Sequence, residues 1–443
     1  AGLSGRFHFI GPQDDLDDAY AATDVYALTS REDPFPSVAL EAWSSGVPVV
    51  AFAGTGGIAD LIAAHAADHR DAPGGWHTAS RRTGADGDPD IDADGDDAPP
   101  TGPLGLLAPA FDTDAFADAL LRLLDDAALH ARCAAAGRHR VETRHAFRGY
   151  ALDVLATVGI DLPRVSAVVP NFNYARYLPQ RLDGICAQRL PPAEVLVLDD
   201  ASTDGSVDAV LAARPALQPD IRLLRSRRNG GSVFRQWRRG ARLVEGEFVW
   251  IAEADDAADP RLLEALIAPM QAHPDVVMAY CQSAAIDGEG HMLSADYHGY
   301  TDDLSPARWR GPYLATGAQE AEAGLAVRNT IPNVSAVVFR RAPLLDTLER
   351  HWDDIAARRI AGDWTVYLHL LTRGRIAYDP RPLNRHRRHV RSATARLDAA
   401  RHLAEVQAVQ ALAAHLYPLS PATERAARAW RAHLREHFGL PAD

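Results

Sequence analysis

Three carboxylates follow an apolar, strand-forming run in the second half of the chain. The run covers Phe248 to Ala252, and the acids are Glu253, Asp255 and Asp256. Carboxylates this close repel one another unless a cation lies between them. A divalent cation that also carries a phosphate ligand would meet that need. A solvated acidic loop after a strand is the alternative interpretation, and the neighbouring motifs favour the cation.

Polar, turn-forming residues also follow three earlier strand-like runs. The runs cover 165–169, 194–198 and 221–224, and the polar residues after them cover 170–174, 199–206 and 229–232. In a parallel α/β sheet the carboxyl ends of the strands meet at one edge and open toward the ligand crevice. Helix capping explains one such end, for example residues 202–206, but it does not explain four in register. The pattern therefore predicts a nucleotide pocket.

The elements that must position these side chains alternate as in an α/β protein. We expect helices over 176–188, 206–213, 233–243, 260–272 and 363–372, and further strands over 276–281 and 334–339. Two C-terminal helices divide near Pro418 and Pro421, and residues 1–66 repeat the βαβα order on a smaller scale. Residues 284–330 look irregular. We therefore predict an α/β fold of two tandem Rossmann-like units.

The composition is that of a folded, acidic protein. Of 443 residues, 47% are hydrophobic, and the formal net charge is −13, which argues against a nucleic-acid partner. All 46 basic residues are arginine, which excludes Schiff-base and P-loop chemistry based on lysine. The cysteines Cys133, Cys186 and Cys281 are too few and dispersed for a disulfide framework. We therefore expect a reducing, cytoplasmic location, and no apolar run reaches the ~18 residues that span a bilayer.

The motifs of the second unit resemble those of the family 2 glycosyltransferases, which have the GT-A fold. In chain order they read VSAVVPNFNYARYL, VLVLDDASTDGS, RNGG and FVWIAEADD, and the resemblance extends over residues 163–394. It implies transfer of a sugar from a nucleoside diphosphate sugar, usually with inversion. It also implies a set of donor-site residues: Pro170 and Asn173 at the nucleotide, Asp199 and Asp200 at the base and ribose, and Asn229 and Gly230 near the ribose and diphosphate.

The acidic cluster takes the place of the Asp-x-Asp metal motif of that family. Asp255 would bind Mn²⁺ or Mg²⁺, with Glu253 as a substituted first position and Asp256 as a supporting residue of the donor site. The metal would neutralise the charge that develops on the diphosphate leaving group. The resemblance further implies that His389, at the family spacing before Ser392 and Thr394, reaches the metal or the diphosphate.

The acceptor hydroxyl must lose its proton, which requires a carboxylate base. The family carries this base in an acid–aromatic pair at the start of a helix, and Asp363 with Trp364 matches the pair. Capping of the helix is the alternative role of Asp363. Residues 329–335 are expected to shape the acceptor side.

Residues 31–50 resemble the C-terminal half of the family 4 glycosyltransferases, which have the GT-B fold. Two acids eight positions apart mark that half; Glu41 matches the second, and Asp33 stands near the first. Gly56 and Gly57 would bring backbone N–H groups close to a phosphate, or they form a tight turn. A GT-B site lies between two domains, and this chain holds part of one. We therefore expect this unit to be inactive as given, whether it comes from a longer two-headed enzyme or is an idle remnant of fusion.

The expected domains are a partial GT-B-like domain over 1–160, a GT-A domain over 163–396 and a helical extension over 397–443. Residues of about 68–103 lack apolar periodicity and are interpreted as a disordered insertion. Within it, residues 90–95 match the start of a calcium loop, but Thr101 stands where that loop needs Glu. We expect solvated acids there instead.

The sequence thus predicts a metal-dependent inverting glycosyltransferase. Its donor would be a nucleoside diphosphate sugar, with uridine suited to the two aspartates at the base, and its acceptor a glycan or lipid-linked hydroxyl in cell-surface glycan or polysaccharide synthesis. A lipid-linked acceptor would bring the protein to a membrane surface. The alternative is a non-catalytic sugar-nucleotide or glycan-binding module. Asp255, Asp256, Asp363 and His389 argue against it, since binding alone needs no base.

Overall fold

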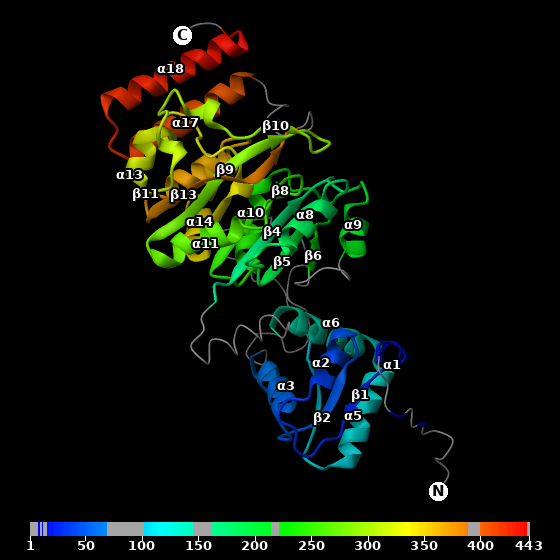
Figure 1. Ribbon diagram of the computed structural model, residues 1–443. Coiled ribbons are helices and arrows are strands. Elements are labelled where there is room, and N and C mark those ends of the chain that lie inside the picture. The colour runs from blue at the N-terminus through cyan, green and yellow to red at the C-terminus, as the bar shows by residue number, and fades with distance from the viewer. Residues whose placement is uncertain are drawn as a thin grey trace. The chain divides into compact units, whose positions relative to one another are not determined.

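The chain forms two compact units, which we describe separately. The computed structural model (Figure 1) describes residues 8, 11, 16–68, 102–144, 162–213, 221–388 and 399–440. The units cover residues 1–154 and 155–443. Nearly all of the expected insertion lies outside the described residues, as does most of residues 1–15.

The first unit contains a small parallel sheet. Its strands pair in the order β1 (Tyr26–Leu28), β2 (Val49–Phe52), β3 (Gly105–Ala108). Its helices are α1 (Asp17–Ala21), α2 (Ser37–Ser44), α3 (Gly57–Asp68), α5 (Thr113–Asp125) and α6 (Ala127–Arg144). Every residue of the central strand β2 is buried, as expected for a parallel strand covered on both faces. The expected βαβα order is confirmed here.

The second unit is built on one mixed sheet, of which one half is parallel. Its strands are β4 (Val165–Asn171), β5 (Glu194–Asp199), β6 (Ile221–Arg225) and β7 (Phe248–Ile251), and they lie in the spatial order β7-β4-β5-β6. Connecting helices are α8 (Leu178–Cys186), α9 (Ser206–Ala213) and α10 (Val233–Leu243). The four polar strand ends therefore meet at one edge of the sheet, as predicted.

Close packing of α10 on β4 fixes that half of the sheet. A Cβ atom at Gly240 would lie 2.4 Å from Cγ1 of Val168, so the helix backbone rests directly on the strand. On the same helix, Phe234 and Trp237 pack edge to face with ring centroids 5.2 Å apart. This packing sets the distance between α10 and the polar strand ends.

The other half of the sheet continues with β12 (Val337–Arg340), β9 (Val276–Ile286), β13 (Arg375–Arg387) and β11 (Tyr313–Thr316). The short strands β8 (Ala257–Ala258) and β10 (Met292–Ser294) pair with β13 and β9. We did not predict β13, which contains Pro380 and Pro382, from the sequence. Proline donates no ladder hydrogen bond and disguises a strand, and the register of β13 on β9 shifts at this place.

Helices cover this half and close the unit. They are α11 (Leu262–Ala272), α14 (Arg341–Arg350), α15 (Trp352–Ala356), α16 (Gly362–Leu370), α17 (Ala399–Leu416) and α18 (Pro421–Phe438). The predicted division of the C-terminal helices is confirmed. Residues of both, among them Val409 and Leu434, share a hydrophobic core with Trp364 of α16, so they pack against the helix that carries the expected base.

The segment between β9 and β12 is more ordered than expected. It contains α12 (His298–Thr301), a 3₁₀ turn (Arg308–Arg310), α13 (Gly317–Glu320), a π-helical turn (Ala321–Leu325) and a 3₁₀ turn (Val334–Ala336). Such π-helical turns are frequent at functional sites.

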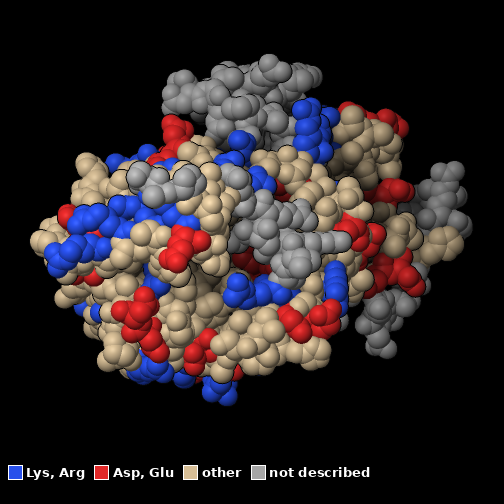
Figure 2. All heavy atoms as spheres, turned by 90° about the horizontal axis from the view of Figure 1, so that it is seen from above, with Lys and Arg blue, Asp and Glu red and all other residues tan. Residues whose placement is uncertain are grey.

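Surface arginines pair with acids. On the face shown in Figure 2, basic side chains lie among acidic ones. Examples of such pairs are Arg310 with Asp302 at 2.8 Å and Arg261 with Asp259 at 2.8 Å. Within the described ranges, no helix is both long and apolar enough to cross a bilayer.

Candidate active site

The acidic loop after β7 is fixed by hydrogen bonds to two distant segments. Asp256 is 2% exposed. One of its oxygens accepts the Ser335 hydroxyl at 2.6 Å, and the other accepts the Arg387 backbone N–H at 2.8 Å. The Ser335 hydroxyl also accepts the Glu253 N–H at 3.0 Å. Asp256 therefore joins the loop to the 3₁₀ turn and to β13.

Arg387 holds the same loop from the side of β13. Its guanidinium donates to the Asp255 carbonyl at 2.6 Å and to Gln180 at 2.8 Å, and it stacks on Tyr177, 4.7 Å from the ring centroid. Because arginine spreads five donors in a plane, one side chain can fix several segments. This holding role of Arg387 did not follow from its place in the sequence.

A second arginine lies buried behind the loop. Arg181 is fully buried, and its guanidinium stacks on Trp250 at 4.7 Å. Its three guanidinium nitrogens have no hydrogen-bond partner among the described residues. Burial lowers the pKa of Arg181 to about 10, and the charges of Asp256, Asp255 and Glu253 act against that decrease. Arg181 thus places positive charge close to the three acids, which sequence spacing could not reveal.

Glu253 and Asp255 are the partly exposed acids of the loop. Burial, together with the charges of Asp255 and Asp256, raises the pKa of Glu253 to about 8. The same acids act on Tyr174, whose pKa is raised by burial first and then by Asp255 and Glu253. The acids of the loop therefore oppose one another's ionisation, and a cation bound beside them would favour their charged forms.

At the ends of β4 and β5, side chains bond mainly to one another. Asp199 is 1% exposed and accepts Asn171 Nδ2 at 2.8 Å and the Ser202 N–H at 3.1 Å. Asn173 has a positive φ of 61°, which asparagine tolerates, and it accepts the Thr203 N–H at 2.8 Å. Pro170 is buried within β4. Asp199 and Asn173 thus shape the turns that form the edge of the site.

Asp200 joins the β5 end to the glycine turn after β6. It accepts the Gly230 N–H at 3.0 Å and the Gln236 side-chain amide at 2.9 Å. Burial is the largest influence on its carboxyl and raises its pKa, against the lowering effect of the Gly230 hydrogen bond. Asn229 lies beside it and donates to the Asp200 carbonyl at 3.4 Å. Asn229 and Gly230 are exposed at this edge, so a ligand can approach them.

Asp363 stands in the first turn of α16, as expected for the base. Its Oδ2 accepts Asn329 Nδ2 at 3.0 Å, and its Oδ1 accepts the Trp364 N–H at 2.7 Å. Burial raises the pKa of Asp363 to about 6. Trp364 donates its indole N–H to the carbonyl of Leu325, at the end of the π-helical turn, at 2.8 Å, so this turn positions the pair. Asn329 lies in the segment expected at the acceptor side.

The base candidate and the acidic loop lie near one buried tyrosine. Burial raises the pKa of Tyr367, and the charges of Asp363 and Glu253 raise it further. Glu253 follows a parallel strand, and Asp363 begins a helix more than a hundred residues later. The fold thus brings together two acids that the sequence assigned to different tasks.

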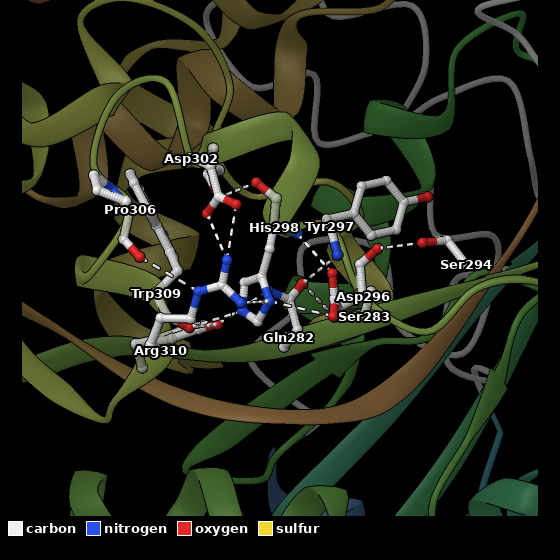
Figure 3. A network of polar contacts seen from close by, with 12 residues as sticks. Gln282, Ser283, Ser294, Asp296, Tyr297, His298, Asp302, Pro306, Trp309 and Arg310 are labelled. Carbon is white, nitrogen blue, oxygen red and sulfur yellow. Dashed lines mark hydrogen bonds and ion pairs between the residues drawn. The ribbon is translucent and has the colours of Figure 1, made fainter.

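Segment 296–310 is held on β9 by a network of polar contacts (Figure 3). Tyr297 donates its N–H to Gln282 at 3.3 Å. Beyond it, the His298 ring lies 3.0 Å from an Arg310 guanidinium nitrogen and 3.2 Å from the Asp296 carboxylate. Segment 296–310 showed no periodic pattern in the sequence, but these contacts give it a defined structure within the second unit.

His386 is a histidine of this site that the sequence did not single out. Its Nδ1 lies 2.7 Å from the Tyr297 hydroxyl, and its charge acts to lower the pKa of Asp256, which burial raises. The pairing of β13 with β8 brings Arg385 opposite Ala257, which explains the position of His386 beside the loop. His389, the expected metal neighbour, lies outside the described residues.

The acids of the loop fit a metal that arrives with a nucleotide. Among the described residues, no three His, Cys, Asp or Glu side chains converge as a metal site. Mg²⁺ and similar hard cations, however, commonly bind one or two carboxylates together with substrate phosphates and water. Asp255, partly exposed beside the buried Asp256, could supply such a carboxylate.

In the first unit, the predicted residues are held by contacts within the chain. The Tyr20 hydroxyl lies 3.2 Å from Glu41 Oε2. The pKa of Tyr26 is raised by burial and then by Glu41 and Asp33, which places both acids near one ring. Gly57 donates its N–H to Pro34 O at 2.9 Å, and a Cβ atom at Gly56 would collide with Asp33 O. At Gly56 and Gly57 the backbone thus packs closely against Asp33 and Pro34 of the same chain.

Each of the two units matches a family of known proteins. Residues 166–316 match the family model described as Glycosyl transferase family 2, and residues 1–76 match Glycosyl transferases group 1. The second unit thus matches the family 2 glycosyltransferases over residues 166–316. The resemblances of both units are therefore confirmed, as is the α/β fold of two tandem units. The family 2 match ends before β12, so Asp363 and the C-terminal helices lie beyond it.

Relatives of this chain include proteins of several bacteria. Uncharacterized proteins of Mycobacterium bovis and Mycobacterium tuberculosis are each 28% identical over 227 residues, 51% of this chain and 59% of theirs. Chondroitin synthase of Escherichia coli is 25% identical over 138 residues, 31% of this chain and 20% of that protein. The chain thus spans less than two thirds of the mycobacterial relatives.

Solved structures also resemble this chain. TarS 1-349 of S. aureus has a TM-score of 0.44 at 18% identity and covers 62% of this chain and 72% of that chain. A mannosyltransferase of Pyrobaculum calidifontis, solved with GDP-Man and Mn²⁺, has a TM-score of 0.42 at 21% identity and covers 62% and 70%.

Proposed function

We propose that the family 2 domain transfers a sugar from a nucleoside diphosphate sugar to an acceptor hydroxyl, with inversion at the anomeric carbon. The observation that carries the proposal is the meeting of two chemically distinct features in one fold. One is the polar edge formed by β4 to β7, and the other is Asp363, partly buried at the start of α16.

Asp363 is proposed as the general base. Its pKa of about 6, raised by burial, lies close to neutral pH, where a carboxylate base combines ionisation with useful basicity. Asn329 donates a hydrogen bond to one of its oxygens and would orient the carboxylate. One base and one displacement invert the anomeric carbon, because the acceptor attacks from the face opposite the leaving group.

The donor is proposed to lie along the strand ends. Asn229 and Gly230 offer exposed polar groups there, and Asp199 and Asp200 hold the turns in place. A divalent cation, Mn²⁺ or Mg²⁺, bound at Asp255 would neutralise charge on the departing diphosphate. Arg387 bonds the backbone of the acidic loop, and Arg181 places positive charge close to its acids.

The finer assignments are also proposals. Uridine as the base follows from the resemblance of the aspartate pair. A cell-surface glycan or lipid-linked acceptor, and the cytoplasmic setting, follow from family resemblance and from the dispersed cysteines. The kinship with chondroitin synthase supports a glycan acceptor.

The test is metal-dependent hydrolysis and transfer with a panel of uridine, guanosine and thymidine diphosphate sugars. Asp363→Asn should lower the transfer rate by about 100-fold or more, since a positioned base contributes that much. Asp255→Ala should lower the transfer rate to a similar extent, because the metal would lose its carboxylate ligand. Asp346→Asn, which removes a carboxylate from the exposed side of α14, is the matched control and should leave the rate unchanged.

Two outcomes would contradict the proposal. Equal rates for the wild type, Asp255→Ala and Asp363→Asn would place the site elsewhere. Calorimetric binding of UDP with Mn²⁺ and no turnover of any donor would indicate a binding module instead.

A further inference from the structure

Three consecutive backbone amides just before α16 are bound by one carboxylate from the C-terminal helices. Glu405 of α17 accepts the N–H groups of Arg359 at 2.9 Å, Ile360 at 3.0 Å and Ala361 at 3.2 Å. The residue is 5% exposed. These amides belong to the turn that leads into the first turn of α16, where Asp363 lies.

Burial of this charge requires compensation, and the turn supplies it. A carboxylate taken out of water is costly unless hydrogen bonds satisfy it. Burial raises the pKa of Glu405, but the N–H groups of Ile360, Arg359 and Ala361 outweigh that effect and hold its pKa below the ordinary value. Within α17, Glu405 also pairs with Arg401 at 3.3 Å, but the three N–H groups come from outside the helix. The charge at position 405 is therefore better explained by the turn than by the helix.

The turn has little freedom once Glu405 holds it. Ala361 is the N-terminal cap of α16, and Gly362 follows with a backbone so close to Phe234 that a Cβ atom would lie 2.4 Å from its ring. Asp363 comes next. Its carboxylate is thus placed by Glu405 on one side and by the α10 packing on the other. The negative charge of Glu405 also adds to the burial that raises the pKa of Asp363.

The same helical pair reaches the partner of Asp363. Gln410 of α17 donates to the Val327 carbonyl at 2.7 Å. Arg328 stacks on Trp430 of α18 with its guanidinium 4.4 Å from the ring centroid. Asn329, the donor to Asp363, is the next residue. Both sides of the carboxylate are therefore connected to α17 and α18.

We propose that Glu405 is a positioning residue of the transfer reaction, which fixes the turn 359–361 so that Asp363 meets the acceptor hydroxyl. This inference rests on the proposed function. It makes the C-terminal helices part of the catalytic unit, although they lie beyond the segment that the family model matches.

The test compares Glu405→Gln with Glu424→Gln in the full chain. The amide side chain of Glu405→Gln would keep the shape but offer one acceptor oxygen to three N–H groups. Glu424 lies exposed on α18 and pairs with Arg428, so its substitution removes the same charge from the same helical pair. Glu405→Asp is the second variant, which keeps the charge but withdraws it by one methylene. Thermal unfolding confirms that each variant is folded.

For Glu405→Gln we expect kcat to fall about tenfold or more, because small misplacement of a reacting group is costly. The KM for the donor should stay unchanged, since Glu405 does not contact the β4–β7 edge. The acidic limb of the pH–rate profile should move to lower pH, because a negative charge near Asp363 is lost. Glu405→Asp should also lower kcat, but the acidic limb of its pH–rate profile should not move, because the negative charge is kept. Hydrogen exchange at amides 359–361 should rise in both variants and not in Glu424→Gln.

The outcomes separate this inference from the proposed function. A wild type without transfer activity contradicts the proposed function, and the exchange measurement then still decides whether Glu405 holds the turn. An active wild type with unchanged kcat and pH profile in Glu405→Gln overturns the inference. So does unchanged exchange at 359–361, or an equal loss of activity in Glu424→Gln.

Discussion

At the scale of single residues, environment gives different tasks to the same side chain. Asp256 is buried and bonded on both oxygens, so it holds segments together. Asp255 is partly exposed and could bind a cation. Asp363 accepts the side chain of Asn329, and burial raises its pKa to about 6. The residue type is the same in each case, and hydrogen bonding and burial make the difference.

The raised pKa of Asp363 predicts a pH dependence of activity. Because a base must be ionised, the transfer rate should fall about tenfold per pH unit below a pKa of about 6. The measurement is kcat/KM between about pH 4.5 and 8.5 with a non-titrating control for protein integrity. If the acidic limb of the pH profile stays in the same place when another carboxylate is substituted, for example in Asp346→Asn, the assignment of the limb to Asp363 is supported. A rate that is flat down to about pH 5 would contradict it.

The same shift predicts how stability changes with pH. Folding raises the pKa of Asp363 above its unfolded value, so its ionisation opposes folding as pH rises from about 4 to 6. Asp363→Asn should therefore unfold at a higher temperature than the wild type at about pH 8. The difference should shrink toward about pH 4, where Asp363 is protonated in the folded state and half-protonated in the unfolded one.

At the scale of elements, the site depends on how closely helices pack on the sheet. The backbone of α10 rests on β4 at Gly240, and that contact places Gln236 within 2.9 Å of Asp200. Register matters as well, because β13 pairs with β8 and so brings residues 384–387 beside the acidic loop. Neither contact follows from helix or strand propensity.

We expect Gly240→Ala to destabilise the second unit, although alanine favours helices over glycine. The added Cβ would lie 2.4 Å from Val168, and overpacking of this kind costs about 1–3 kcal/mol. Gly299→Ala in α12, where a Cβ meets no atom within 4 Å, is the control and should be neutral or slightly stabilising. Urea denaturation compares the two. Equal midpoints would show that α10 can shift without cost.

At the scale of the whole molecule, the two units differ in what they contain. The second unit holds the polar edge, the acidic loop, Asp363 and the helices that support it. In the first, Glu41 and Asp33 lie near tyrosines, and Gly57 is used by a turn of the chain. Any chemistry of the first unit in a longer protein remains a prediction.

Residues 155–443, produced alone, should therefore unfold in one cooperative transition and keep the transfer rate of the full chain. The reason is that the proposed catalytic residues and their contacts lie within this unit. The measurements are thermal unfolding by circular dichroism and kcat with the same donor. A loss of activity in a folded fragment would show that the first unit contributes to the reaction.

The sequence by itself determined the α/β class, the two units, and the meeting of four strand ends at one edge. These features follow from local periodicity and from the geometry of parallel sheets, so a pattern of apolar runs and polar ends was enough. The division of the C-terminal helices near Pro418 was also readable, because proline ends or begins helices.

The tertiary structure decided which side chains share one environment. Arg181 behind the acids, Ser335 beneath Asp256 and Glu405 beneath the turn of Asp363 are each separated from their partners by tens of residues. Strand β13 was hidden by its prolines, and His386 became a neighbour of Asp256 through it. Such contacts arise from packing and long-range pairing, whose energies depend on the whole fold and leave no periodic signal along the chain.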